Sequence, residues 1–368
     1  MKYADIVDYD KLDPFKQEAI RRFRETLKYP NRFGMRIIKE SVGETAVVLE
    51  ADFLKGVYLA FNVEGLGTKN IVAESMAEKE RIGQGLGISR RKLFAGLGQD
   101  VMAMSLNDLG AVGGIPVVYG PIVALGSNDY LVDEDIRNGL LDGFVGGAEI
   151  AHVAIPGGET PTLRGIVYPT TMDLAGASIG IVPITRLCLG RELRAGLLIY
   201  GVGSSGIHAN GLSLARAIAE KSPQGYFTKL PSGKTIGEAL LTATILYSPL
   251  VEALNKEKAE IEYMQPITGH GWAKIMRKKK DLTYVIEHVP EPQEEFRFLD
   301  EQGAIGAEEL YKTFNMGVGW VLFAPANNSA KIRRACEICN LSMYELGHIE
   351  HGPREVRILS IDVTYRPH

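Results

Sequence analysis

The glycine-rich stretch GVGSSGIHANG, residues 201–211, constrains the fold of this chain more than any other feature of the sequence. It follows the apolar run AGLLIY and precedes LSLARAIAE, whose apolar residues recur at helical spacing. An apolar run, a glycine loop and an amphipathic segment predict a strand, a tight connection and a helix. The loop is then either a simple turn or an anion site at a helix N-terminus, and composition leaves both open.

Strands and helices of this kind follow one another along the whole chain, which predicts an α/β protein with mixed (α+β) sheets. At 368 residues the chain is long enough for two domains. The connection PITRLCLGRELRAG has no strong period, so we place the boundary near residue 188, giving domains 1–188 and 189–368.

Periodicity and capping residues predict the individual elements. The predicted strands cover residues 45–52, 56–65, 116–125, 173–182, 197–202, 317–325 and 354–362. The predicted helices begin at Pro14 with Asp13 as N-cap, cover 99–111 and 133–152, begin again at Asn210, and cover 236–254 (one helix or two), 308–314 and 331–340. Residues 81–98 and 288–296 are expected to be loops, and 153–160 a strand that runs into a loop.

The charge of the chain argues against a polyanionic partner. Net charge is −4, so nucleic acid and anionic membranes are not expected partners. The basic run 277–280 fits the C-terminus of a helix. No apolar window is long enough to span a membrane, and the N-terminal residues MKYADIVDYD lack the apolar core of a signal peptide, so the cytoplasm is expected. Cys336 and Cys339 form a CxxC that lacks a second pair, which favours packing within a helix over a zinc site.

The segment QDVMAMSLNDLG predicts a mostly apolar helix that carries three polar side chains. Asp100 and Asn107 lie nearly in line along it, and Asp108 sits about 80° further round. Carboxylates on an apolar helix are costly unless they are hydrated, paired or bound to metal. A solvated stripe and a metal site therefore both remain open for this helix.

Glu64 favours the metal interpretation. It ends a predicted strand in NVEGLGTK, beside two glycines, a threonine and Lys69. Magnesium takes one or two carboxylates together with water and phosphate oxygens, and glycines let backbone N–H groups approach an anion. The spacing differs from a Walker A loop and from a dinucleotide fingerprint.

Three further loops carry polar groups. PGGETPT places Glu159 and Thr160 after a glycine pair, and ITGHGW places His270 between glycines. His208, in the opening stretch, is the side chain there that can move a proton near neutral pH.

Together these segments resemble the aminoimidazole ribonucleotide (AIR) synthetase family, the phosphoribosylformylglycinamidine cyclo-ligases. EGLGTK is similar to the family's D-G-V-G-T-K, and QDVMAMSLNDL to D-L-V-A-M-x-x-N-D. GGET with MDLAGASIG, SSGIHANGLSLAR, and ELYKTFNMGVGWVL are similar to three more family motifs. These motifs keep the family's order, from about Tyr3 to Val321.

The resemblance implies a two-domain fold whose N-terminal domains pair into a β-barrel-like dimer core. It implies a homodimer with ATP and Mg2+ as cofactors and a small ribonucleotide as substrate. The implied reaction closes the ring of formylglycinamidine ribonucleotide to give aminoimidazole ribonucleotide, ADP and phosphate. Phosphorylation turns an amide-type oxygen into a good leaving group, so an internal nitrogen can then attack the carbon.

The resemblance also implies roles for individual residues. Metal ligands would be Glu64, Asp100 and Asp108. Nucleotide-binding residues would be Gly65, Gly67, Thr68, Lys69, Asn107, Asp108, Gly158, Glu159 and Thr160. Substrate-binding residues would be Ser204, Ser205, Asn210 and Thr268. Catalytic residues would be His208, Lys69 and His270, with His208 as the candidate for proton transfer.

Three departures from the family pattern bear on the substrate. Glu64 stands where the family usually has aspartate, and PTLRG follows Thr160 in place of the usual A-E-M-P-G. Pro266 replaces a histidine, and His270 stands where glycine is usual. The alternatives are therefore a related ATP-dependent phosphotransferase with another amide or amidine substrate, and a non-catalytic nucleotide-binding protein.

Overall fold

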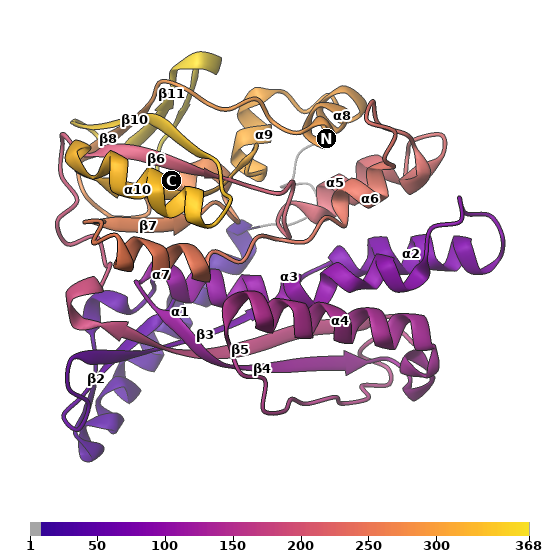
Figure 1. Ribbon diagram of the computed structural model, residues 1–368, viewed down its shortest axis with the longest axis horizontal. Coiled ribbons are helices and arrows are strands. Elements are labelled where there is room, and N and C mark those ends of the chain that lie inside the picture. Colours follow the sequence, from indigo (N-terminus) through magenta and orange to yellow (C-terminus); the bar gives the residue numbers. More distant parts are fainter. Residues whose placement is uncertain (1–8, 368) are drawn as a thin grey trace.

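The structure, a computed structural model, describes residues 9–367, and each half of that range builds one β-sheet (Figure 1). The start of the N-terminal segment that resembles the family, from Tyr3 to Asp8, lies outside the described residues. The first half contains, in order, α1 (Tyr9–Phe23), η2 (Arg24–Phe33), β1 (Met35–Ile37), η3 (Lys39–Ser41), β2 (Val47–Ala51), β3 (Val57–Gly65), α2 (Lys69–Arg81), α3 (Arg90–Ala111), β4 (Ile115–Leu125), η4 (Asn128–Val132), α4 (Glu134–Ala151), β5 (Met172–Pro183) and η5 (Ile184–Arg186).

The first sheet has five strands in the order β1-β2-β3-β5-β4, and all its neighbouring strands are antiparallel. Helix α3 contacts β3, β4 and β5 on one face and packs against α4. The opposite face carries exposed apolar side chains, because the strands alternate between a covered and an uncovered side. Phe61, on β3, pairs across the sheet with Ile179, on β5, and the two are 43% and 48% exposed.

The second half builds a mixed sheet of seven strands in the order β12-β11-β8-β10-β6-β9-β7, in which β11 and β8 are parallel. Strands β8 and β9 of this sheet are buried along their whole length. This half contains β6 (Leu198–Gly203), α5 (Leu212–Ala219), η6 (Gly225–Phe227), α6 (Ile236–Leu240), α7 (Ser248–Lys256), β7 (Tyr263–Pro266), η7 (Gly271–Met276), β8 (Leu282–Ile286), α8 (Glu294–Gly303), α9 (Ala307–Thr313), β9 (Val318–Ala324), η8 (Ala326–Asn328), α10 (Ser329–Ile338), β10 (Met343–His351), β11 (Glu355–Ile358), η9 (Leu359–Ile361) and β12 (Val363–Tyr365).

The two halves share a hydrophobic core. One cluster of buried side chains includes Leu97 and Val101 from α3 together with Ile199 from β6 and Leu240 from α6. Contacts between α2 and α6, and between α3 and both α7 and β7, join the halves. The face of α3 that bears polar residues therefore meets the second half of the chain.

Most predicted strands are confirmed to within about two residues, but several elements differ. Residues 90–98, expected to be a glycine-rich connection, form the first turns of α3. The reason is helix packing: a Cβ on Gly98 would lie 2.5 Å from the backbone nitrogen of Phe144, so the glycine lets α4 approach α3 closely. The glycines of this segment thus serve a helix contact and do not mark a loop.

Other predictions were wrong at element ends. Helix α1 begins at Tyr9, so Pro14 lies inside the helix and Asp13 is not its N-cap. Helix α8 begins inside the expected loop 288–296, and β11 ends at Ile358 because a 3-10 turn follows it. The segment 153–160 makes isolated parallel bridges to β4 without forming a strand of its own. Strands β1, β7, β8, β10 and β12 were not predicted.

The expected helix or helix pair over 236–254 is two short helices, α6 and α7, separated by residues 241–247. These intervening residues become important below, because their backbone groups bond to side chains of the first half. In the part of the chain that the structure describes, no helix is long and apolar enough to cross a membrane. The three cysteines are unpaired, and Cys336 is buried within α10.

Candidate functional site

A cleft of about 450 Å³ lies where the two halves meet. It is lined from the first half by the end of β3, the start of α2 and one face of α3, and from the second half by two loops and η7. Its lining residues are Glu44, Thr45, Glu64, Gly65, Leu66, Gly67, Thr68, Met104, Asp108, Ala209, Asn210, Gly211, Leu212, Ser213, Thr268, Gly269, His270, Lys274 and Arg277. The sequence-predicted Glu64, Gly65, Gly67, Thr68, Asp108, Asn210, Thr268 and His270 are thus brought together here.

Two carboxyl groups, those of Glu64 and Asp108, hydrogen-bond to each other in this cleft. Burial, reinforced by the neighbouring Asp108, raises the pKa of Glu64 to about 7. Burial also raises the pKa of Asp108, although the nearby cations oppose that shift. A hard divalent cation prefers carboxylate oxygens as ligands, and its charge favours loss of a proton from such a pair. The two hydrogen-bonded carboxyl groups are therefore suited to bind one.

Two cations face these carboxyl groups from the second half. Lys274, on η7, donates to Thr268 Oγ1 at 2.5 Å, and its charge lowers the pKa of both Glu64 and Asp108. Arg277 lies 3.7 Å from Glu44, which also pairs with Lys278. Burial lowers the pKa of Lys274, and the Asp108 carboxylate opposes this. The cleft therefore has an acidic wall from one half and a basic wall from the other.

Within residues 9–367, two buried polar atoms of the cleft have no hydrogen-bond partner. They are Thr68 Oγ1 and Asn210 Nδ2. Thr68 is the N-cap residue of α2, but its side chain does not cap the helix. Because a buried polar group without a partner is costly, these atoms are suited to bind a ligand that enters the cleft. The N-terminus of α2 adds free backbone N–H groups that favour an anion.

The loop Gly201–Gly211 presents only its last residues to the cleft. His208 is buried behind it, with φ of 60°, and its Nε2 accepts the backbone N–H of Ser205 at 3.3 Å. Burial lowers the pKa of His208 to about 3, so the ring is neutral at ordinary pH. Ser205 Oγ donates to the carbonyl of Ala243, and Ser204 Oγ to Asn315 Oδ1. These three side chains hold the loop in shape and do not line the cleft.

Three polar residues of the first half also lie outside the cleft. Lys69 and Asp100 form a fully buried ion pair at 2.8 Å. Asn107 donates to the carbonyl of Ile245 and accepts the N–H of Tyr247, both at 2.8 Å. Asp100 and Asn107 lie in line on α3, as the sequence indicated, and both bind the segment 241–247. Asp108, further round the helix, is the one that faces the cleft.

The expected three-carboxylate metal site is therefore not assembled. Asp100 is bonded to Lys69 and to the backbone and hydroxyl of Thr244, which removes it from the Glu64–Asp108 pair. Among the residues that the structure describes, no group of three or more His, Cys, Asp or Glu side chains lies close enough to hold one metal ion. Two carboxylates remain, a number that suits magnesium when water and phosphate supply the other ligands.

Gly158, Glu159 and Thr160 lie apart from the cleft of their own chain. They are exposed, and Glu159 bridges to Ile122 on β4. Ile122 in turn pairs with Ala175 on β5, and Ala175 pairs with Gly65 on β3. Two strands thus separate Glu159 from the cleft, and it stands at the edge of the uncovered sheet face.

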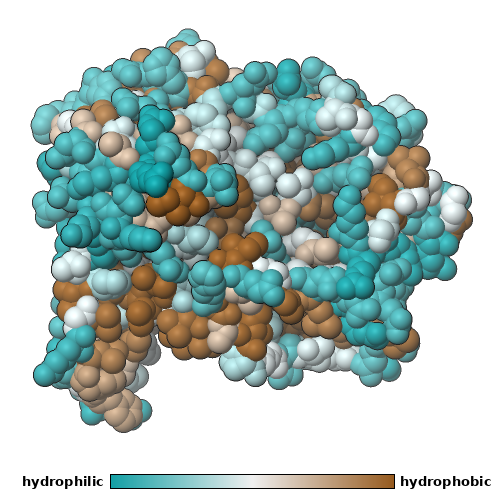
Figure 2. Space-filling view, in the orientation of Figure 1, coloured by the Kyte–Doolittle hydropathy of each residue, from teal (hydrophilic) through white to brown (hydrophobic). Residues whose placement is uncertain are grey.

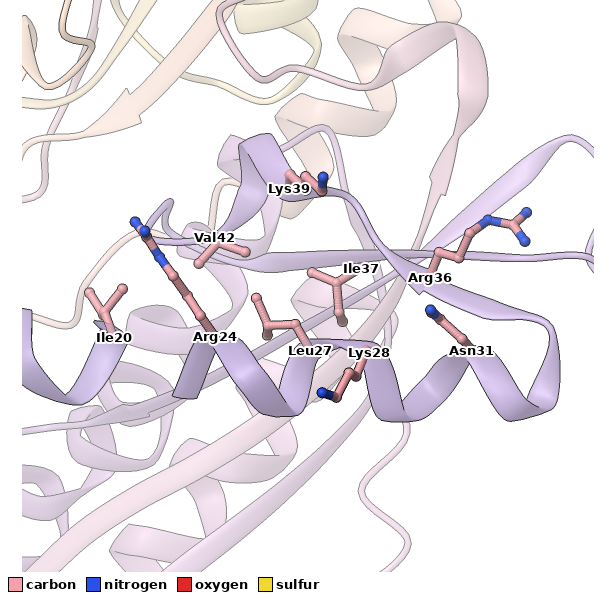
Figure 3. A pocket seen from close by; sticks show the side chains of 10 residues that line it. Ile20, Arg24, Leu27, Lys28, Asn31, Arg36, Ile37, Lys39 and Val42 are labelled. Atoms are coloured by element: carbon pink, nitrogen blue, oxygen red, sulfur yellow. The ribbon is translucent and has the colours of Figure 1, made fainter. Parts of the chain in front are cut away.

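A separate cavity of about 690 Å³ lies between η2 and β1 (Figure 3). Leu27 and Ile37 face each other across it, whereas Lys28 and Arg36 extend away from its centre (Figure 3). Its lining includes none of the residues predicted from the sequence and no carboxylate among the described residues. The cleft between the halves is therefore the candidate site.

Comparison with known proteins identifies the family. The sequence matches the family model described as "AIR synthase related protein, N-terminal domain" over residues 43–182. It matches "AIR synthase related protein, C-terminal domain" over residues 194–360. The chain belongs to the AIR synthase family. The resemblance inferred from the ordered motifs is thereby confirmed.

Curated family members are similar over most of their length. A phosphoribosylformylglycinamidine cyclo-ligase of Methanosarcina barkeri is 34% identical over 335 residues, which cover 90% of this chain and 91% of that protein. One from Methanothermobacter thermautotrophicus is 34% identical over 357 residues, which cover 96% and 95%.

Solved structures of the family fold are more distant in sequence. AaThiL complexed with AMPPCP and TMP has a TM-score of 0.61 at 15% identity, covering 100% of this chain and 97% of that chain. The protein tt0281 from Thermus thermophilus has a TM-score of 0.57 at 16% identity, covering 89% and 91%. These structures show that the two-domain family fold is shared, which confirms the predicted mixed α/β class.

Several residues of the site were not found from the sequence. Arg277 was expected at a solvated helix end and Thr45 in a strand, whereas Lys274 and Glu44 were not singled out. Asn315 binds Ser204, the carbonyl of Gly206 and the N–H of Gly317, so it organises the glycine loop from within FNMGVG. The motif itself was the available signal for Asn315, whereas for Lys274 it was the position shortly after ITGHG.

Proposed function

We propose that this protein closes the ring of formylglycinamidine ribonucleotide to give aminoimidazole ribonucleotide, with ATP converted to ADP and phosphate. The observation that carries the proposal is the cleft between the halves, in which the Glu64–Asp108 pair faces Lys274 and Arg277. A phosphoryl transfer needs cations around phosphate groups and a fixed geometry, and this cleft supplies both. The names of the curated relatives support the choice of reaction.

In this proposal, Glu64 and Asp108 hold a magnesium ion, which neutralises the charge of the transferring phosphate. The N-terminus of α2 and Thr68 Oγ1 receive the phosphate chain of ATP, and Asn210 Nδ2 donates to the nucleotide or the substrate. These assignments rest on the unpartnered Thr68 and Asn210 atoms and on the hydrogen-bonded carboxyl groups of Glu64 and Asp108.

Lys274 and Arg277 are proposed to hold the phosphate of the ribonucleotide substrate. Both line the cleft opposite the carboxyl pair, and Glu44 and Thr268 fix their positions. His270 also lines the cleft and is our candidate to accept the proton that the attacking nitrogen loses. Because Pro266 lies in buried β7, His270 is the imidazole that this region offers the cleft.

The other residues expected at the site receive positioning roles in the proposal. His208 is neutral and buried, so it holds the loop that carries Asn210 and does not move a proton. Lys69, Asp100 and Asn107 hold segment 241–247 against α2 and α3. Ser204 and Ser205 brace the glycine loop.

We further propose a homodimer in which a second copy covers the uncovered face of the first sheet. Phe61, Val63, Val117 and Ile179 project from that face with exposures of 43–55%. Hydrophobic residues gather over the lower part of the molecule, where the first half lies (Figure 2). Gly158, Glu159 and Thr160 stand at the edge of this face, so we propose that they serve the dimer's sites. We also keep residue 188, within the connection between the two sheets, as the proposed domain boundary.

The test is to incubate the purified chain with ATP, magnesium and formylglycinamidine ribonucleotide. We expect aminoimidazole ribonucleotide and ADP in equal amounts. Absence of the imidazole product together with absence of substrate-dependent ADP would overturn the proposal. Substrate-dependent ADP without ring closure would instead indicate a related phosphotransferase.

A further inference from the structure

A cavity of about 720 Å³ lies in the first half, away from the cleft. It is lined by α2, by the start of α3, by η4 and the start of α4, and by the turn that precedes β5. In the described chain it shares no lining residue with the cleft. Its volume lies within the range of small-molecule sites.

Glu74, on α2, lines this cavity and is held by an unusual convergence of donors. Its Oε1 accepts hydrogen bonds from Tyr130 OH at 2.8 Å, Thr171 Oγ1 at 2.9 Å, Asn70 Nδ2 at 3.1 Å and the backbone N–H of Met172 at 3.3 Å. One carboxylate oxygen thus ties α2 to η4 and to the start of β5. This network accounts for Oε1 alone.

The other oxygen, Oε2, has no hydrogen-bond partner among the described residues. Nor is it a fully buried atom, because it is absent from the set of buried polar atoms without a partner. It is therefore accessible from the cavity that Glu74 lines. Burial raises the pKa of Glu74, and the donors to Oε1 lower it. A carboxylate carries about four acceptor sites, so Oε2 offers unused lone pairs to a donor that enters the cavity.

The cations of the cavity wall are already neutralised. Arg81 pairs with Glu78 at 2.7 Å, and Arg90 pairs with Asp133 at 2.6 Å and with Asp135 at 2.9 Å. Glu74 has no ion-pair partner in the described chain, and neither has Asp129, which also lines the cavity, so the wall carries more acidic than basic side chains.

The rest of the wall includes apolar and aromatic side chains. Ile71, Phe94, Ile136 and Tyr168 are among them, and Tyr168 is 79% exposed. An aromatic face beside an unpaired carboxylate is an arrangement that attracts organic cations, because both the ring and the carboxylate favour positive charge. A free inorganic cation would gain nothing from the apolar wall.

We propose that this cavity binds a small organic cation, whose ammonium group donates to Glu74 Oε2 while its hydrocarbon part lies against the apolar wall. The site is separate from the proposed cyclisation site and does not depend on that function. No covalent step is involved.

The test uses isothermal titration of the full chain with spermidine and putrescine, and with 1,4-butanediol as a neutral probe. We expect saturable binding of the amines and none of the diol. Glu74→Gln keeps a carbonyl oxygen for the four donors at Oε1 and replaces Oε2 by an NH2 group, which repels an ammonium group. It should weaken amine binding at least tenfold.

Glu149→Gln is the matched control, because it removes the same charge from an exposed position of α4 outside the cavity. It should bind the amines as the unchanged chain does. If Glu74→Gln fails to fold, Tyr168→Ala replaces it, since this exposed ring can be removed safely and should cost several-fold in affinity. Unchanged affinity in the folded variant tested, or no saturable amine binding by the unchanged chain, would overturn the proposal. Cyclisation activity should be the same in all variants.

Discussion

Lys69 and Asp100 form an ion pair that water does not reach. The Lys69 Nζ lies 2.8 Å from Asp100 Oδ1, and both side chains are 0% exposed. Lys69 also donates to the carbonyl of Thr242, and Asp100 accepts the N–H of Thr244, each at 2.7 Å. The pair therefore fastens α2 and α3, in the first half, to the segment between α6 and α7, in the second.

The variant Asp100→Asn should destabilise the protein by about 3–5 kcal/mol, because it leaves the Lys69 charge buried without a counter-ion. Urea denaturation measures this loss. The double variant Lys69→Met with Asp100→Leu should recover much of the stability, since neither charge then remains buried. A loss below about 1 kcal/mol together with lost magnesium affinity would show instead that Asp100 is a metal ligand.

Asp108→Asn should have the opposite effect: stability toward urea should be kept and magnesium–nucleotide affinity should be lost. Its carboxyl group is held at a raised pKa by burial, so removing the charge should leave the urea midpoint unchanged or higher. Magnesium–nucleotide affinity, measured by titration calorimetry, should fall more than tenfold because one of the two proposed metal ligands is lost. Glu149→Gln, the exposed control, should bind as the unchanged chain does. Equal affinity in Asp108→Asn would reject the metal assignment.

Lys274→Met should raise the KM for the ribonucleotide at least tenfold at saturating magnesium and ATP. The variant removes a cation from the basic wall of the cleft and leaves the substrate phosphate facing carboxylates. Lys279→Met is a close control, since Lys279 lies shortly after η7 but is exposed and does not line the cleft. A KM that rises equally in both variants would indicate a general charge effect and not a phosphate contact.

The difference between Lys274 and Lys279 illustrates what a single sequence can and cannot reveal. Lys279 belongs to the basic run 277–280 and Lys274 lies shortly before it, and only the folded structure shows that Lys274 lines the cleft whereas Lys279 does not. In α3, by contrast, helical geometry separated Asp108 from Asp100 and Asn107 correctly. Helical geometry alone could not show whether the face with Asp100 and Asn107 or the face with Asp108 lines the cleft, because that depends on how the second half packs against α3.

The fold shows the same division. The alternation of β3 and the apolar runs of β5, β6 and β9 predict these strands well, because one or both faces of each are buried. Helix α3 was predicted too short, since the contact that requires Gly98 comes from α4, which is distant in the sequence. Strands β7, β8 and β10 lack clear alternation and are strands because they pair with β9, β6 and one another.

Glu295 should make stability depend on pH. It is buried at the start of α8, and burial raises its pKa to about 7 from an ordinary value of 4.5, with Glu294 raising it and Lys234 lowering it. The folded state thus binds the proton more tightly than the unfolded state. The free energy of unfolding is therefore highest, as far as Glu295 is concerned, below pH 4.5. It falls as the pH rises from 4.5 to 7, and above pH 7 it is lower by about 3 kcal/mol.

Urea midpoints for the unchanged chain and for Glu295→Gln, measured from pH 5 to pH 8, test this prediction. The variant should lack most of the fall with rising pH. Glu294→Gln, an exposed neighbour whose pKa is lowered by its bonds to Ser232, should retain the fall. Identical pH slopes for Glu295→Gln and the unchanged chain would contradict the assignment.

Phe61→Glu and Ile179→Glu should convert the proposed dimer into a monomer. Phe61 and Ile179 are cross-strand neighbours on the uncovered face of the first sheet, so a charge at either would be buried without a partner in a dimer. Light scattering coupled to size exclusion measures the mass. Val132→Glu places the same charge at a position of η4 that is 69% exposed, and it should leave the mass unchanged.

Because Gly158, Glu159 and Thr160 lie at the edge of the same face, the monomeric variants should also lose cyclisation activity while keeping their urea midpoints. A monomeric mass for the unchanged chain, or full activity in a monomeric variant, would contradict the proposed role of this face.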